Sequence, residues 1–314
     1  MDYTISTRKA YGAALEEVGA NPDIVVLDAD LKSCTMTCYF AEKYPRRFFN
    51  CGIAECDMAG IAAGIASTGK TVFINSFAIF SAGKIYDQIR NAICYQNLDV
   101  KVVGTHAGLN VGEDGATHQA LEDLSLMRAV PNMTVVCPCD AFETVAATHA
   151  ISVHQGPCYL RLGRTSVGDV TSGKADYRFE IGKAVRMREG SDVTIIATGL
   201  MVQESLKAAD MLARQGVEAA VLNMHTLKPI DEKAIVKAAM ETGALVTAEE
   251  HNVIGGLGAA VSEVIVKSKP VPVEFVGVED TFGHSGQPSE LMQKYCLTPE
   301  RIVESACRAM QRRG

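Results

Sequence analysis

Hydrophobic residues recur along the chain in two alternating patterns. Short runs rich in Val, Ile and Leu, such as Ile24–Leu27 and Val100–Val103, are typical of buried strands. Longer segments with apolar residues at helical spacing, such as Ser6–Val18 and Ala141–Val153, lie between such runs. Strands that alternate with helices in this way indicate parallel βαβ units. Further strands are predicted within residues 71–80 (a strand and its exit loop) and at residues 133–137, 158–164, 193–197, 219–222 and 273–277. Further helices are predicted from just after Glu55 to about residue 67 and near residues 86–95, 121–128, 202–215 and 299–312.

A change in composition separates these elements into two groups. Residues 165–192 are rich in Ser, Gly, Asp and mixed charges and show little periodicity. We therefore predict two doubly wound α/β domains, at residues 1–165 and 191–314, joined by a linker at residues 166–190. At 314 residues the chain is long enough for each domain to bury a core of its own.

Composition narrows the class of protein. Hydrophobic residues make up 47% of the chain and charged residues 21%, as in a soluble α/β protein and unlike a disordered one. A formal charge of −7 without a basic stripe argues against nucleic-acid binding. No apolar run approaches membrane-spanning length, and the first residues lack the apolar core of a signal peptide. The ten cysteines are scattered without a Cys-x-x-Cys pair, so we expect reduced thiols and a cytoplasmic protein without a metal site of its own.

A carboxylate stands out within this pattern. Glu55 comes just before a helix rich in Ala and Gly, where the positive end of the helix dipole favours a negative charge. An acid in this position is ordinary helix-start composition, but Phe77 and Phe80 follow on the next strand and its exit loop. A carboxyl beside apolar rings can retain a proton that a solvated carboxyl would lose.

Polar side chains also gather where the predicted parallel strands end, the edge at which such sheets bind ligands. Asp30 follows the strand Ile24–Leu27, although Asp is also common in turns. His106, Asp114 and His118 share the glycine-rich loop after Val100–Val103, and two histidines and an acid in one loop indicate a functional site.

Four motifs together make the chain similar to a known family. It resembles the pyrimidine-binding domain of thiamine-diphosphate enzymes of the transketolase group, and its second half resembles the transketolase C-terminal domain. The first resemblance rests on Gly52-Ile53-Ala54-Glu55, Ser76-Phe77-Ala78-Ile79-Phe80, Asp87-Gln88-Ile89-Arg90 and Gly112-Glu113-Asp114-Gly115, and the second on residues 223–230, 244–251 and 255–258.

The resemblance implies a role for each candidate residue. Glu55 would hydrogen-bond the aminopyrimidine ring of thiamine diphosphate, Phe77 and Phe80 would pack on that ring, and Asp30 would also contact the cofactor. His106 and His118 would take part in catalysis. Phosphate and hydroxyl groups of the substrate would be bound by Arg8, His106, Asp114 and Arg164. One departure is Gly83, which stands where many relatives carry a third aromatic residue.

The diphosphate end of the cofactor has no matching motif. The family holds its metal with Gly-Asp-Gly and a later Asn, whereas Glu113-Asp114-Gly115 lies in the histidine loop and lacks that Asn. The resemblance therefore implies the C-terminal subunit of a split transketolase that acts on sugar phosphates and associates into a dimer. A separate N-terminal subunit would hold Mg²⁺ or Ca²⁺ and share the cofactor. The alternatives are the β subunit of a 2-oxo acid dehydrogenase and a non-catalytic scaffold subunit.

Two histidines of the second half are left open. His251 precedes the glycine pair Gly255-Gly256, which is typical of a tight turn before a helix, and this favours a structural role. The sequence assigns no role to His225.

Overall fold

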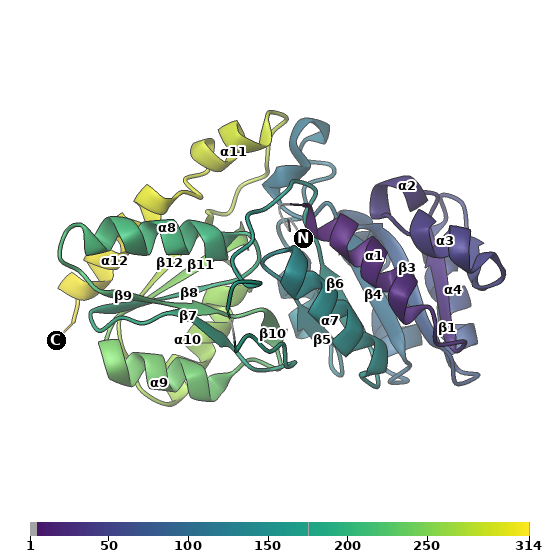
Figure 1. Cartoon of the computed structure of the whole chain (residues 1–314), viewed down its shortest axis with the longest axis horizontal. Coiled ribbons are helices and arrows are strands. Elements are labelled where there is room, and N and C mark those ends of the chain that lie inside the picture. Colours follow the sequence, from purple (N-terminus) through teal and green to yellow (C-terminus); the bar gives the residue numbers. More distant parts are fainter. Residues whose placement is uncertain (1–4, 175, 314) are drawn as a thin grey trace.

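The computed structural model describes residues 5–174 and 176–313. Two α/β domains, each with a mainly parallel sheet, lie side by side (Figure 1). The predicted fold class of two α/β domains is confirmed. The domain limits at residues 1 and 314 lie outside the described residues, and the internal boundaries stay predictions. No helix within the described part of the chain has both the length and the apolar character needed to cross a membrane.

The first sheet has seven strands in the order β10-β5-β6-β4-β3-β1-β2. Its strands β1 to β6 are parallel, and β10 alone pairs antiparallel, with β5. Their bounds are Ile24–Asp28 (β1), Phe48–Asn50 (β2), Thr71–Phe77 (β3), Val100–Thr105 (β4), Thr134–Val136 (β5), Cys158–Arg161 (β6) and Thr226–Lys228 (β10).

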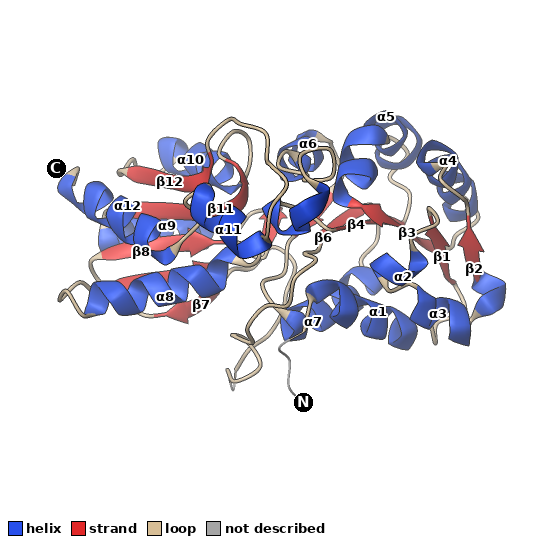
Figure 2. Cartoon of the chain, turned by 90° about the horizontal axis from the view of Figure 1, so that it is seen from above, coloured by secondary structure: helices blue, strands red, loops and turns tan. Residues whose placement is uncertain are grey.

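Helices cover both faces of this sheet (Figure 2). One face carries α1 and α7 with the shorter α2 and α3, and the other carries α4, α5 and α6. The bounds are Thr7–Val18 (α1), Lys32–Thr35 (α2), Cys38–Lys43 (α3), Pro45–Arg47 (η1, a 3₁₀ turn), Glu55–Ala66 (α4), Tyr86–Gln88 (α5), Asp123–Ala129 (α6) and Ala141–Val153 (α7).

Irregular helices replace parts of the predicted pattern around the candidate site. The helix predicted at residues 86–95 is present, but α5 ends after Gln88 and the chain continues as a π-helix, η3 (Ile89–Cys94). A second π-helix, η2 (Ile79–Lys84), follows β3 where an exit loop was predicted. The loop after β4 contains a 3₁₀ segment, η4 (Leu109–Asp114), interrupted at Gly112.

The second sheet has five strands in the order β12-β11-β8-β9-β7, with β7 antiparallel. Its helices α8 and α12 pack together, as do α9 and α10 (Figure 1). The bounds are Val185–Arg188 (β7), Val193–Ala197 (β8), Met201–Ala213 (α8), Ala219–Asn223 (β9), Glu232–Thr242 (α9), Leu245–Asn252 (β11), Leu257–Lys267 (α10), Val273–Val278 (β12), Pro288–Lys294 (α11) and Pro299–Gln311 (α12).

One strand of the second half joins the sheet of the first half. β10 comes from the second half of the chain yet extends the first sheet, with Thr226 opposite Val136. Lys228 strengthens this join, because its ammonium donates to the carbonyl oxygens of Arg128 at 2.9 Å and Val130 at 2.5 Å. The strand β7 lies inside the segment predicted as a linker, so that segment also contributes to the second sheet. The two halves are therefore joined by backbone pairing as well as by side-chain packing.

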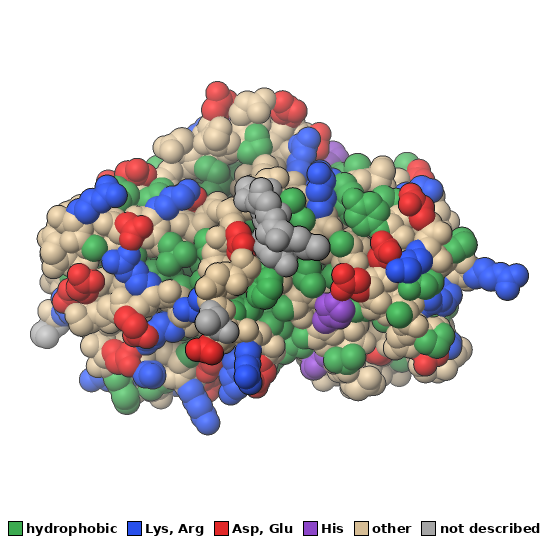
Figure 3. Space-filling model, in the orientation of Figure 1, with side chains coloured by type: hydrophobic (Ala, Val, Ile, Leu, Met, Phe, Trp, Pro, Cys, Tyr) green, Lys and Arg blue, Asp and Glu red, His purple; other side chains and the backbone are tan. Residues whose placement is uncertain are grey.

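Charged side chains are interspersed over both halves on the face drawn in Figure 3. Basic and acidic groups alternate there, and the described residues of that face form no continuous basic stripe.

Candidate active site

Glu55 opens helix α4 and is 3% exposed. Its Oε2 lies 2.6 Å from Nζ of Lys84, whose side chain is half exposed. The hydrogen bond and the charge of Glu55 raise the pKa of Lys84 above its usual range. Because Lys84 ends the π-helix that also carries Phe80, this ion pair ties the start of α4 to the segment after β3.

Two phenylalanines and two histidines form an aromatic cluster beside this pair. The rings of Phe77 and Phe80 are stacked, with centroids 6.3 Å apart and planes inclined by 16°. His106 lies over Phe77 at 4.0 Å, and the His118 ring meets Phe80 edge-on at 5.5 Å. The structure therefore brings together four predicted site residues from β3, η2 and the loop after β4.

His106 is held as a neutral imidazole. Its backbone has a left-handed φ of 56°, which is uncommon for a residue other than glycine. Burial lowers the pKa of His106 to about 3, and the positive charges of Arg8, Arg164 and His118 act in the same direction. Its Nδ1 lies 3.0 Å from Oγ1 of Thr105, so a neutral ring can exchange one hydrogen bond there and keep Nε2 for another partner.

Two arginines lie near this cluster. Arg8 on α1 donates to the carbonyl oxygen of Cys34 at 2.7 Å, and burial lowers its pKa. Arg164 follows β6, donates to the carbonyl oxygen of Val111, and lies 4.0 Å from Asp114. A guanidinium that is open to solvent, as Arg164 is, can bind an anion by two parallel hydrogen bonds, with Asp114 as a competing partner.

Asp30 stands apart from these residues. It is exposed, has a left-handed φ of 64°, and accepts a hydrogen bond of 2.8 Å from Asn50 on β2. Its polar contact is thus with the neighbouring strand rather than with the aromatic cluster. Its predicted contact with a cofactor stays a prediction.

Arg161 is the last residue of β6 and Arg164 follows it, but the two side chains have different surroundings. Arg161 is buried, and its Nε donates to Oδ2 of Asp123 at 2.8 Å. That carboxylate also accepts from the hydroxyl of Tyr159 at 2.7 Å. Arg161 is therefore a core residue, whereas Arg164 faces the loop that contains Asp114.

Sequence reasoning missed Lys84 and Glu250. Lys84 pairs with Glu55 from the end of the π-helix η2, and the periodicity of the sequence does not predict a π-helix there. Glu250 contacts Asn110, a residue 140 positions away, although it lies in the segment that resembled the C-terminal domain. The signal available in both cases was a charged residue within an otherwise apolar segment.

The described residues fit one half of thiamine diphosphate. A buried carboxylate, stacked phenyl rings and open space beside Gly83 suit an aminopyrimidine, since a Cβ at Gly83 would meet only Ile79 Cδ1, at 3.9 Å. For the diphosphate end, the described part of the chain holds no group of three or more His, Cys, Asp or Glu residues able to bind a metal ion.

Comparison with known families agrees with this geometry. The model of the transketolase pyrimidine-binding domain matches residues 3–169, and that of the transketolase C-terminal domain matches residues 182–302. The chain belongs to the transketolase family. The aromatic cluster and Glu55 lie in the part that matches the pyrimidine-binding domain.

Individual transketolase relatives cover nearly all of the chain. It is 44% identical to a 6-deoxy-6-sulfo-D-fructose transketolase subunit of Clostridium sp. (strain MSTE9). The 308 matched residues cover 98% of this chain and 95% of the relative. It is 38% identical to an apulose-4-phosphate transketolase subunit of Phocaeicola vulgatus, over 96% of each chain. A solved structure described as a split gene transketolase, inactive beta4 tetramer, is 50% identical and superposes with a TM-score of 0.92 over 99% of this chain and 100% of that one.

Proposed function

We propose that this chain is the C-terminal subunit of a split transketolase, which transfers a two-carbon ketol unit from a ketose phosphate to an aldose phosphate. The observation that carries the proposal is the buried Glu55 at the start of α4, beside Phe77, Phe80 and the histidine loop. The relatives described as transketolase subunits support it, because each matches this chain over almost its whole length.

Glu55 would bind and orient the cofactor. Thiamine diphosphate, when bound, supplies the thiazolium carbon that accepts the ketol unit. The carboxyl of Glu55 would hold a proton at the ring nitrogen of the aminopyrimidine, while Phe77 and Phe80 stack against that ring and exclude water. Lys84, which now pairs with Oε2 of Glu55, would compete with the pyrimidine for this carboxyl group.

The polar loop would bind the sugar. Arg8 and Arg164 would take the phosphate, and Asp114 would accept a hydrogen bond from a sugar hydroxyl. Neutral His106 can donate to or accept from the reacting oxygens, and His118 lies across the same aromatic cluster. The relatives named for sulfofructose and for apulose phosphate indicate that subunits of this kind serve different sugars, so the proposal extends to the substrate class alone.

The partner would be a separate N-terminal subunit. It would supply the diphosphate-binding domain with Mg²⁺ or Ca²⁺, because the described residues offer no cluster of metal ligands. We also propose that two copies of this chain associate through the outer face of α4. Ile61 on α4 is 41% exposed, and Ile53 just before the helix is 79% exposed. Apart from neighbouring residues and the backbone of α4 itself, a Cβ at Gly60 or Gly64 would meet no described atom within 4 Å. No contact with nucleic acid or membrane is proposed, and the proposed location is the cytoplasm.

Reconstitution tests this function. The two subunits, purified together with thiamine diphosphate and Mg²⁺, should transfer ketol units within a panel of phosphorylated sugars. Glu55→Gln keeps the shape of the side chain and loses the shared proton, so the rate should fall by roughly a hundredfold while the complex still assembles. Turnover of a 2-oxo acid with a lipoyl acceptor would favour the dehydrogenase alternative, and an inactive wild-type complex would favour the scaffold.

A further inference from the structure

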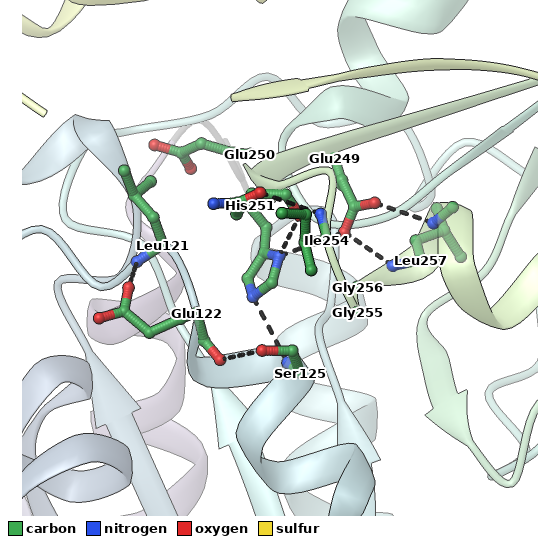
Figure 4. A network of polar contacts seen from close by, with 12 residues as sticks. Leu121, Glu122, Ser125, Glu249, Glu250, His251, Ile254, Gly255, Gly256 and Leu257 are labelled. Atoms are coloured by element: carbon green, nitrogen blue, oxygen red, sulfur yellow. Dashed lines mark hydrogen bonds and ion pairs between the residues drawn. The ribbon is translucent and has the colours of Figure 1, made fainter. Parts of the chain in front are cut away.

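Strand β11 ends between the two halves of the molecule and directs successive side chains to different places. Glu249 accepts hydrogen bonds from the backbone N–H groups of Leu257 at 2.7 Å and Gly258 at 2.8 Å, and so caps helix α10. Glu250 points away from Glu249 and His251 (Figure 4), as alternation along a strand requires. The two adjacent carboxylates therefore act on different elements.

Glu250 holds the start of the polar loop in the other half of the molecule. Its Oε1 accepts from the backbone N–H of Asn110 at 2.8 Å and from the side-chain Nδ2 of Asn110 at 2.9 Å. The side chain is almost fully buried, so these bonds are made away from water. A Cβ at Gly108 would lie 2.3 Å from Cδ of Glu250, and the left-handed φ of 80° at Gly108 also favours glycine. The loop is thus shaped around this carboxylate.

The same loop is held a second time near its end. Gln119 donates through Nε2 to the carbonyl oxygen of His284 at 2.9 Å, and Gly283 packs against that amide. The two attachments come from separate segments of the second half, β11 and the loop before α11. The first attachment is at Asn110 and the second is at Gln119. His106 lies four residues before Asn110, and Asp114 and His118 lie between the two attachments.

The charge of the buried Glu250 carboxylate depends on the groups around it. Burial raises the pKa of Glu250, while the charge of Arg161 and the two hydrogen bonds from Asn110 lower it. Arg161 also donates to the backbone carbonyl of Glu250 at 2.8 Å, which fixes the strand from which the carboxylate projects. Removal of Glu250 would leave the donors of Asn110 without their buried acceptor.

We propose that Glu250 is a positioning residue of the sugar site: by holding Asn110 it sets the geometry of the loop that carries His106, Asp114 and His118. This inference rests on the proposed transketolase function. It gives the C-terminal half a defined task in the reaction, which is to shape a substrate loop of the pyrimidine-binding half. The cofactor residues Glu55, Phe77 and Phe80 lie on α4, β3 and η2, which Glu250 does not contact through a hydrogen bond.

The test compares Glu250→Ala with Glu249→Ala in the reconstituted two-subunit complex. Glu250→Ala should lower kcat/KM for the sugar phosphate by about tenfold or more, while the affinity for thiamine diphosphate changes by less than about twofold. Glu250→Gln should recover most of the loss, because its amide oxygen can still accept from Asn110. Glu249→Ala should lower the melting temperature and leave kcat/KM within about twofold, since Glu249 caps α10 and lies 3.6 Å from His251 but makes no hydrogen bond to the described residues of the polar loop.

Hydrogen exchange separates this inference from the proposed function. In the same complex, Glu250→Ala should speed exchange of the Asn110 amide at least about tenfold and leave the amides of α4 unchanged. If the wild-type complex transfers no ketol units but this exchange appears, the function is wrong and the attachment stands. Unchanged exchange, or equal loss of sugar and cofactor binding, would overturn the positioning role.

Discussion

Burial keeps His106 neutral at the centre of the candidate site. Its pKa is lowered from 6.5 to about 3, so between those values the unfolded chain binds more protons than the folded one. The stability that neutral His106 contributes is therefore complete above pH 6.5 and is lost as the pH falls towards 3. We expect its ring NMR signals, assigned with His106→Gln, to stay constant from pH 8 to pH 5. A titration with a midpoint near pH 6.5 would contradict this environment.

In the proposed function, Lys84 would compete with the cofactor for Glu55. The ammonium lies 2.6 Å from Oε2 of the carboxylate that would hold the aminopyrimidine. Lys84→Met should remove this competitor and tighten thiamine diphosphate binding by the reconstituted complex up to about fivefold, the scale of a partly exposed ion pair. Calorimetric titration measures it, with Lys70→Met as control because Lys70 pairs with Asp23 at the surface. Weaker binding by Lys84→Met would show that Lys84 assists the cofactor.

At the scale of elements, Asp140 fastens helix α7 to the segment that leads into the second half. Its carboxylate accepts from three backbone N–H groups, those of Glu143, Val170 and Thr171, and from the Thr171 hydroxyl. We expect Asp140→Ala to lower the free energy of unfolding by about 3 kcal/mol, measured with urea.

Asp231 is the matched control for this cap. It also begins a helix, α9, but is half-buried and accepts from two backbone N–H groups, those of Ala234 and Ala184, each at 3.0 Å. Asp231→Ala should therefore cost about 1 kcal/mol. Equal losses for the two variants would show that the extra bonds of Asp140 to the linking segment contribute nothing.

The long regular elements could be predicted from the sequence, and the irregular ones could not. Residues 141–153 carry both a helical pattern and an Asp cap, and α7 has those bounds. The π-helices η2 and η3 contain an extra residue per turn that no periodic template separates from an α-helix or a loop. β10 was missed because a three-residue strand is too short to carry a pattern, and its partner β5 is about 90 positions earlier in the chain.

The same distinction applies to the site. Phe77, Phe80, His106 and His118 could be expected to meet because they leave neighbouring strands at one edge of the sheet, and the structure places their rings together. The contacts of Glu55 with Lys84 and of Glu250 with Asn110 depend on tertiary packing between distant segments. The catalytic and binding roles of these residues stay predictions.

At the scale of the whole molecule, the two halves act on one site. The first half supplies the carboxylate, the rings and the polar loop, and the second half holds that loop at Asn110 and at Gln119. The pairing of β10 with β5 adds backbone hydrogen bonds between the halves. A substitution at the contacts between the two halves is therefore expected to impair the proposed sugar site more than it impairs the surroundings of Glu55.

The incomplete cofactor site leads to a prediction for the isolated chain. Its aromatic rings and Glu55 can contact the pyrimidine, but the described residues offer no metal-binding group for the diphosphate. Without those contacts we expect a Kd for thiamine diphosphate above about 1 mM, so that titration calorimetry with Mg²⁺ shows little heat.

Adding the proposed N-terminal subunit should change that result. The complex would join the pyrimidine contacts of this chain to the diphosphate contacts of its partner, so binding should become tighter by at least about a hundredfold. Glu55→Gln in the complex should weaken thiamine diphosphate binding, whereas Glu249→Ala should not, because Glu249 contacts α10 and His251 and lies outside the proposed cofactor site. Micromolar binding by the isolated chain would mean that its own residues hold the diphosphate, and the split arrangement would be wrong.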